Sequence, residues 1–152
     1  MALAKENAVL ITVSLNLASD AATVPVARHI VRASLDEIGV TTDCVTDIEI
    51  ALSEAATNVL KHAGPGDSYE VSCELNDTSC IIRVVDRGHG FDHATLGFDH
   101  ADASAEQGRG IQLMRELVDQ VRFISKPEDG TIVHLEKRLT FTDESIVVRA
   151  RG

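Results

Sequence analysis

Residues 53–63 read SEAATNVLKHA and include two polar side chains, Glu54 and Asn58, four positions apart. Apolar residues recur with helical spacing from Val45 to Leu60, which predicts a helix through this stretch. Glu54 and Asn58 then lie one turn apart, beside the apolar stripe of the helix. A carboxylate next to a carboxamide can accept a proton and bind Mg²⁺ through oxygen. The same spacing is also common on solvated helix faces, so the pair alone leaves both interpretations open.

The residues before this helix predict a strand and another helix. Residues 9–17 alternate apolar and polar side chains, which is the pattern of a strand with one buried face. Apolar residues at helical spacing cover residues 24–38, where Pro25 fits the first turn and Gly39 fits a C-terminal stop. Residues 41–43 then offer capping side chains for the start of the next helix.

Two strand-like runs, 69–75 and 79–85, come after that helix and flank Asn76-Asp77. This pattern predicts a β-hairpin with a two-residue turn. The turn would place Cys73 directly opposite Cys80. The three cysteines of the chain form an odd set without metal-type spacing, which favours packed, reduced thiols and leaves a pairing of these two open.

The C-terminal part of the chain predicts a third helix and two further strands. Gly108-Arg109-Gly110 opens the helix, and strands are expected at 121–125 and 131–137. A short strand is possible at 146–148. The chain contains no internal repeat, low-complexity stretch or linker, so a single domain is expected.

Composition narrows the classes of function. The chain has 152 residues, 44% of them apolar, which is enough for one domain with one core. It carries 14 basic and 24 acidic residues, a formal net charge of −10. This surplus disfavours direct binding to nucleic acid or to an anionic membrane, because both require clustered Lys and Arg. No run of membrane-spanning length and no secretory leader is visible, so a cytoplasmic location is expected.

A second polar group lies where the predicted strand 79–85 ends, at Asp86-x-Gly88-x-Gly90. Glycines at a strand end allow a ligand to approach the backbone closely. An Asp in this position can accept a hydrogen bond from an exocyclic amine. Asp and Gly are also ordinary turn residues, so a plain turn is the alternative.

A third group of residues follows a long polar loop. The loop covers residues 91–107, and a loop of this length in a compact domain is usually functional. Gly108-Arg109-Gly110 then leads into a helix, whose N-terminal N–H groups can bind phosphate without a large positive side-chain charge. The G-x-G-x-x-G and G-x-x-x-x-G-K-[ST] motifs are absent, which argues against a Rossmann or P-loop nucleotide site.

Together, the three groups in this order resemble the N, G1 and G2 boxes of the GHKL ATP-binding superfamily. Within it, the sequences SEAATNVLKHA, VVDRGHGFD and GRGIQLMRELVD, with Gly130-Thr131 opening the last strand, look like the anti-sigma factor serine/threonine kinases of bacterial partner-switching systems. The resemblance covers residues 9–137. It implies the Bergerat fold, an α/β (α+β) two-layer sandwich in which three main helices cover a mixed, mostly antiparallel sheet.

The resemblance also implies domain limits and cofactors. Residues 9–138 would form the ATPase domain, with terminal extensions at 1–8 and 139–152. ATP would lie in a cleft beneath a lid formed by residues 91–107, and it would be bound together with Mg²⁺.

Individual roles follow from the resemblance position by position. Asp86 would accept a hydrogen bond from the adenine amino group, and Thr131 would support the same base edge. Asn58 would hold Mg²⁺, and Glu54 would orient or deprotonate the attacking hydroxyl of a protein partner. The phosphate path would be shaped by four glycines: Gly88, Gly90, Gly108 and Gly110.

These roles imply an anti-sigma factor that sequesters a sigma factor and phosphorylates a serine or threonine of an anti-anti-sigma antagonist of the STAS type. A homodimer would match the habit of the family. The alternative is a nucleotide-dependent binding module of the same fold without kinase activity. One departure suggests it: related kinases tend to carry a basic residue before the G2 glycines, where this chain has Glu106-Gln107, so Arg109 would have to substitute.

Overall fold

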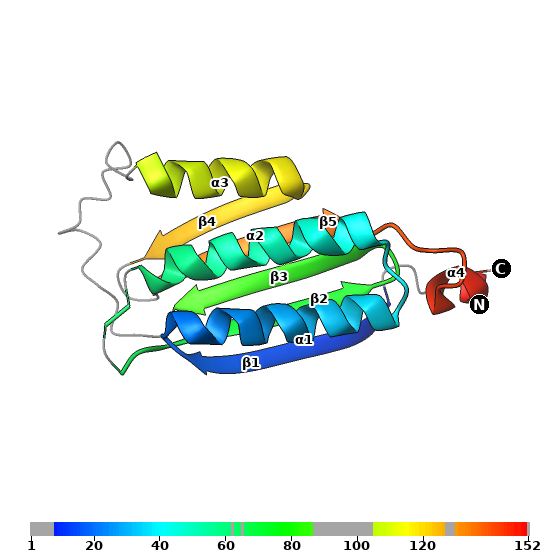
Figure 1. Cartoon of the computed structure of the whole chain (residues 1–152), viewed down its shortest axis with the longest axis horizontal. Coiled ribbons are helices and arrows are strands. Elements are labelled where there is room, and N and C mark those ends of the chain that lie inside the picture. The colour runs from blue at the N-terminus through cyan, green and yellow to red at the C-terminus, as the bar shows by residue number, and fades with distance from the viewer. Residues whose placement is uncertain (1–7, 62, 65, 87–104, 127–129, 152) are drawn as a thin grey trace.

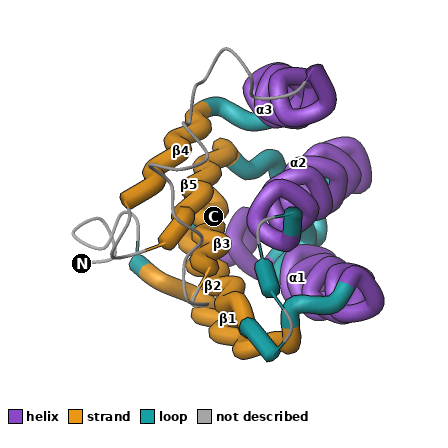
Figure 2. The backbone as a smooth tube through the Cα atoms, turned by 90° about the vertical axis from the view of Figure 1, so that its left-hand side faces the viewer, coloured by secondary structure: helices purple, strands orange, loops and turns teal. Residues whose placement is uncertain are grey.

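The computed structural model of the chain describes residues 8–61, 63–64, 66–86, 105–126 and 130–151. Its strands are β1 (Val9–Ala18), β2 (Ser68–Asn76), β3 (Ser79–Asp86), β4 (Gln120–Lys126) and β5 (Gly130–Arg138). Its helices are α1 (Val24–Glu37), α2 (Thr42–Leu60), α3 (Ala105–Leu117) and α4 (Ile146–Arg151), with the 3-10 turn η2 (Ala21–Thr23) before α1. Helices α1, α2 and α3 lie side by side along the sheet (Figure 1), and Figure 2 shows all three on the same face. The predicted two-layer sandwich with three main helices is confirmed.

The strand order of the sheet is β1-β2-β3-β5-β4, and every neighbouring pair among these five strands is antiparallel. The connection from β1 to β2 contains two helices, so the chain returns to the sheet in the opposite direction. Strands β3 and β4 run in the same direction, but β5 lies between them. The parallel pair that a mixed sheet requires is therefore absent from the described strands.

One core fills the space between the sheet and the helices. Strand β2 buries alternate residues, and Tyr69, Val71 and Cys73 are fully buried. Helix α2 is central, because it contacts α1, α3, β3 and β5. Small side chains at Ala51 and Ala55 are also fully buried, which lets this helix approach the sheet closely. Among the described residues, no helix combines the length and apolarity needed to cross a membrane.

The hairpin between β2 and β3 turns one residue later than predicted. Cys73 lies opposite Ile82, so the prediction that it faces Cys80 directly is wrong. The turn residues are Asp77-Thr78, because the Oδ1 atom of Asn76 accepts hydrogen bonds from the backbone N–H groups of Thr78 and Ser79, at 2.8 and 2.7 Å. Both thiols still point into the core, with their Sγ atoms 3.8 Å apart, and neither is oxidised.

The C-terminal tail forms a helix, so the possible strand at 146–148 is wrong. Its β-branched residues favour a strand locally, but Ser145 caps the helix, since its Oγ accepts from the N–H of Val147 at 3.1 Å. The same hydroxyl donates to the carbonyl of Ile38 at the end of α1. The tail therefore packs on the corner between α1 and α2.

Gly39 makes that contact possible. Its φ is +83°, and a Cβ atom at this position would lie 2.6 Å from the Cβ atom of Ser145. Gly66 has the same φ of +83°, but no described atom lies within 4 Å of its Cβ position. The two glycines thus share a backbone conformation and differ in their surroundings.

We expect Gly39→Ala to lower the free energy of unfolding by about 2 to 4 kcal/mol, through left-handed backbone strain plus overlap with Ser145. Gly66→Ala is the matched control and should cost about 1 kcal/mol, because only the backbone term applies. Urea denaturation measures both values. Equal losses in the two variants would contradict the predicted packing of the tail.

Candidate active site

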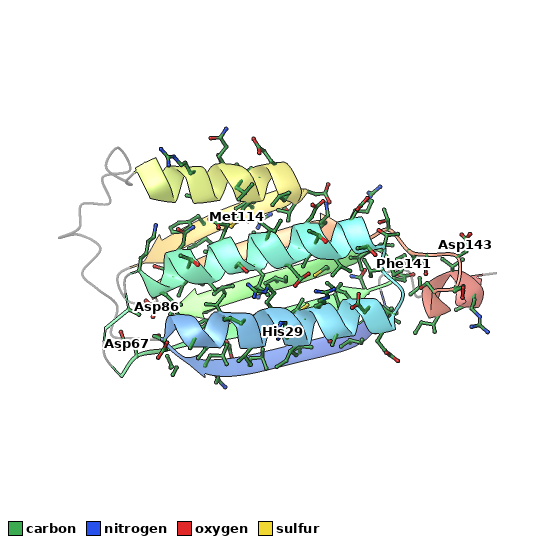
Figure 3. All side chains as sticks on the ribbon, in the orientation of Figure 1. His29, Asp67, Asp86, Met114, Phe141 and Asp143 are labelled. Carbon is green, nitrogen blue, oxygen red and sulfur yellow. The ribbon has the colours of Figure 1, made fainter. Side chains whose placement is uncertain are left out.

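Four parts of the fold meet at one end of the sheet, on the left of Figure 1. They are the C-terminal half of α2, the end of β3, the start of α3 and the start of β5. Figure 3 places Asp86 at this end. Because these elements are far apart in the sequence, the tertiary structure is what brings the candidate residues together. The candidates that they carry are Glu54, Asn58, Asp86, Gly108, Arg109, Gly110 and Thr131.

Glu54 and Asn58 face α3 at Gly110. A Cβ atom on Gly110 would lie 3.0 Å from Glu54 Oε1 and 3.5 Å from Asn58 Nδ2. The absence of a side chain at Gly110 therefore lets the α3 backbone approach these two groups closely. Both groups lie on the side of α2 that packs against α3. The alternative of a plain solvated face is wrong for Asn58, which is buried.

Asn58 is incompletely satisfied. It is 3% exposed, and its amide nitrogen Nδ2 has no hydrogen-bond partner within the described part of the chain. Leaving a buried polar group unsatisfied costs about 1–3 kcal/mol. Native structures tolerate such groups where a ligand, an ion or water completes the site. Asn58 is therefore a candidate contact for a ligand.

Asp86 and Thr131 form the second part of the site, at neighbouring strand ends. Val85 pairs with Ile132, so the register brings Asp86 beside Thr131, and both are buried. Gly130 allows this approach: its φ is +78°, and a Cβ atom there would lie 2.5 Å from the carbonyl oxygen of Asp86. Among the described residues, Thr131 Oγ1 has no hydrogen-bond partner. A buried carboxylate beside a buried hydroxyl suits a ligand with a polar edge.

Tyr69 is a supporting residue that sequence reasoning missed. It is the Cα partner of Asp86 between β2 and β3, and it is fully buried. Its hydroxyl oxygen lies 2.7 Å from Thr23 Oγ1. Burial raises the pKa of Tyr69, and the hydrogen bond with Thr23 partly offsets the rise, so the hydroxyl stays protonated. The available signal was that this is the only tyrosine of the chain, at an inward position of its strand.

Helix α3 begins at Ala105, earlier than predicted. Gly108 and Gly110 therefore lie inside its first two turns and not ahead of it. Gly108 and Arg109 are exposed, whereas Gly110 is buried. Glycine disfavours a helix by about 1 kcal/mol relative to alanine, and the packing of α3 on α2 outweighs this cost.

The predicted lid, residues 91–107, is thus too long at its C-terminal end, because residues 105–107 belong to α3. Residues 91–104 of the predicted lid lie outside the described residues, as do Gly88 and Gly90. The first unsatisfied N–H groups of α3 are those of residues 105–108.

Lys137 anchors the other end of α3, a role that the sequence did not indicate. Its Nζ donates to the carbonyl of Leu117 at 2.7 Å and lies 3.6 Å from Asp47 Oδ2 on α2. A cation is favoured at this terminus by the helix dipole and the unsatisfied carbonyls. Met114 is fully buried beneath the helix. These contacts hold α3 in place and so fix Gly110 over Glu54.

A shallow groove on the outer side of α1 and α2 reaches Glu54. Arg28 crosses it, donating from Nη1 to Ser53 Oγ at 3.3 Å, with its Nε 3.9 Å from Glu49 Oε2. Glu54 therefore borders both the inner site and the outer surface. The groove is lined by Arg28, Thr46, Glu49, Ile50, Ser53 and Glu54. A second groove, at the hairpin end of the sheet, contains none of the candidate residues.

Comparison with known proteins agrees with this geometry. Residues 17–137 match the model of the histidine kinase-like ATPase domain family. The chain belongs to this family. Membership of an ATPase domain family implies ATP binding.

Curated relatives of this histidine kinase-like ATPase domain match it over most of their length. The chain is 35% identical to the anti-sigma F factor of Pasteuria penetrans over 130 residues, covering 80% of this chain and 87% of the relative. It is 29% identical to the serine-protein kinase RsbW of Halalkalibacterium halodurans over 137 residues, covering 84% of this chain and 83% of the relative.

A solved structure shares the fold. The crystal structure of the RsbU and RsbW domains of a Mycobacterium tuberculosis protein matches with a TM-score of 0.66 and 22% identity. The match covers 86% of this chain and 33% of that chain. The expected α+β architecture of the histidine kinase-like ATPase domain is therefore confirmed.

Asp86→Asn is expected to weaken ATP binding by about 10- to 100-fold, because a hydrogen bond to a buried charged acceptor contributes about 1.5–3 kcal/mol. Calorimetric titration with ATP measures the change. Asp143→Asn, on the exposed tail, is the control and should bind as the wild type does. Equal affinity of Asp86→Asn and the wild type would contradict the assignment of the adenine site.

Proposed function

We propose that this protein is an ATP-dependent anti-sigma factor and serine/threonine kinase. It sequesters a sigma factor, and it phosphorylates a serine or threonine of an anti-anti-sigma antagonist of the STAS type, which then releases the sigma factor. The observation that carries the proposal is the grouping of Glu54 and Asn58 against Gly110 in a histidine kinase-like ATPase domain. The names of the relatives, anti-sigma F factor and serine-protein kinase RsbW, support it. This function belongs in the cytoplasm, where transcription takes place.

The nucleotide is held by few side chains. The buried carboxylate of Asp86 accepts from the adenine amino group. The hydroxyl of Thr131, which has no partner in the described part of the chain, supports the same edge of the base. The phosphates lie towards the start of α3, where backbone N–H groups and the positive end of the helix dipole favour anions. Gly108 and Gly110 leave the backbone accessible, and Arg109 is exposed beside them. An acidic protein can therefore bind a polyphosphate.

The residues around Asn58 fit a magnesium ion. Its carboxamide oxygen is a ligand of the kind that Mg²⁺ prefers, and Asn58 is buried where α2 meets α3 at Gly110. Among the described residues no group of three or more His, Cys, Asp and Glu forms a metal site. Mg²⁺ does not need one, since it usually keeps several waters and binds one or two protein ligands plus phosphate. When bound, it neutralises charge on the phosphates.

Glu54 acts on the hydroxyl of the protein substrate. The serine or threonine oxygen forms a bond to the γ-phosphorus, the bond from that phosphorus to the β–γ bridging oxygen breaks, and ADP leaves. The hydroxyl proton passes to the Glu54 carboxylate. Glu54 borders the groove between α1 and α2, so a partner docked on that surface can present its hydroxyl there. Correct placement of the two reactants supplies most of the acceleration.

One observation favours the second candidate, a nucleotide-dependent binding module without kinase activity. The residues before the glycines are Glu106-Gln107, so no basic side chain precedes them, and the exposed Arg109 is the nearest cation in the sequence. A module of this kind would bind ATP and the sigma factor but transfer no phosphate. Phosphate transfer therefore distinguishes the two candidates.

Glu54→Gln is expected to reduce phosphate transfer to the antagonist by about 100-fold or more, the usual contribution of a general base. The measurement is incubation with γ-labelled ATP, Mg²⁺ and candidate STAS-type antagonists. Glu116→Gln, exposed on α3, is the control and should transfer at the wild-type rate. Binding of ATP and sigma factor by the wild type without label on any antagonist would support the binding module.

The face of the sheet opposite the helices suits a second copy of this chain. Arg83 and Arg122 lie on either side of His134 in one cross-strand row, with Arg83 Nε donating to His134 Nδ1 at 3.3 Å. The next outward-facing row carries Glu74 and Glu136, paired with Ile81. In a two-fold pair, the arginines of one copy can meet the glutamates of the other. We therefore include a homodimer in the proposal.

Arg83→Glu should shift the protein from dimer to monomer, because it places like charges opposite each other across the two-fold axis. Sedimentation equilibrium measures the association. Arg149→Glu, exposed on α4, is the matched control and should leave association unchanged. A wild type that sediments as a monomer would contradict the homodimer without affecting the kinase assignment.

A further inference from the structure

The two glycines at the start of α3 have different surroundings. A Cβ atom on Gly110 would lie 3.0 Å from Glu54 Oε1, closer than nearly all real Cβ contacts. The same atom would lie 3.5 and 3.7 Å from the two terminal atoms of Asn58, which is ordinary van der Waals contact. A Cβ atom on Gly108 would meet no described atom within 4 Å. Only Gly110 therefore restricts a neighbouring side chain, and that side chain is Glu54.

The backbone around Gly110 is held from several sides. Helix α3 is anchored by the buried Met114 and by the bond from Lys137 to the carbonyl of Leu117. Helix α2 is buried between α1, α3 and the sheet. The carboxylate of Glu54, in contrast, is the free end of a side chain with rotatable bonds. An added methyl group at Gly110 would therefore displace this carboxylate and not the two helices.

We propose that Gly110 is a positioning residue for Glu54, an inference that rests on the proposed kinase function. Its missing side chain leaves the space in which the Glu54 carboxylate lies. Glu54 can then point along the α2–α3 interface and not away from it. Gly110 thus acts on the transfer step through Glu54, beyond the general role of glycines in shaping the path of the phosphates.

This role predicts that Gly110→Ala loses phosphate transfer but keeps ATP binding. Substitution of a glycine that only shapes the path of the phosphates would weaken both. Filling the space moves the carboxylate by a few tenths of an ångström. A misplacement of about 1 Å can reduce the rate of a reaction by about 100-fold, so this smaller shift should reduce it by about tenfold. Asp86 and Thr131 lie on other strands, and Asn58 is only in ordinary contact with the added atom. Nucleotide binding should therefore persist while transfer is lost.

The experiment compares Gly110→Ala with Gln112→Ala, an exposed substitution on the same helix. We expect Gly110→Ala to lower kcat for transfer to the antagonist by about tenfold, with the Kd for ATP changed less than about threefold. Gln112→Ala should retain both values. Thermal denaturation should show that both variants are folded, with a single cooperative transition. A parallel loss of ATP binding in Gly110→Ala, or wild-type transfer by this variant, would overturn the proposal.

A double variant tests whether the effect passes through Glu54. Glu54→Asp shortens the side chain by one methylene and removes the overlap with an added methyl group. The loss in Gly110→Ala/Glu54→Asp should then be smaller than the product of the two single losses, since residues in contact are not additive. Losses that multiply would show that Gly110 acts independently of Glu54, and would overturn the proposal.

A crystal structure of Gly110→Ala provides a readout that does not depend on phosphate transfer. A displaced Glu54 carboxylate, with α2 and α3 in their wild-type positions, supports the proposal. An undisplaced carboxylate with a shifted α3 overturns it. Failure of the proposed kinase function is distinguishable, because the wild type would then label no antagonist. The crystal structure of Gly110→Ala would still show whether the Glu54 carboxylate is displaced.

Discussion

The close packing of α2 on the sheet is the interaction on which the rest of the molecule depends. Fully buried alanines, including Ala51 and Ala55, allow this helix to lie near β3 and β5 while it also contacts α1 and α3. Because α2 is buried on several sides, polar residues on the side that faces α3 are also shielded from water. Asn58 lies on that side, and its amide nitrogen has no partner among the described residues, a cost that the surrounding apolar contacts offset.

Two close approaches of the backbone complete the site. Gly110 brings α3 against Glu54 and Asn58, and Gly130 brings the start of β5 against the carbonyl of Asp86. In both places a Cβ atom would lie too close to a polar oxygen, so only glycine allows the approach. The result is a set of buried polar side chains at one end of the sheet, in a chain whose net charge is −10. Backbone N–H groups, and not a surplus of basic side chains, can then bind the phosphates.

Most of the fold was predictable because its signals are local. The alternation at 9–17 and the helical spacing at 24–38 correspond to β1 (Val9–Ala18) and α1 (Val24–Glu37) within one residue at either end. The errors have physical causes. The hairpin turn shifted because Asn76 accepts two backbone hydrogen bonds. Helix α3 begins before its glycines because packing on α2 outweighs their low helix propensity.

The amino-acid order alone predicts most of the helices and strands and the helical spacing of Glu54 and Asn58. It also predicts the candidate residue types at the ends of the strands and helices. Periodicity and turn chemistry act over a few residues, so a linear chain displays them directly. The tertiary structure decided that Asn58 is buried, that Tyr69 lies opposite Asp86 in the sheet and that Lys137 anchors α3. These contacts join residues from different elements, and they exist only once the helices and strands are packed, because burial and proximity are properties of the packed chain.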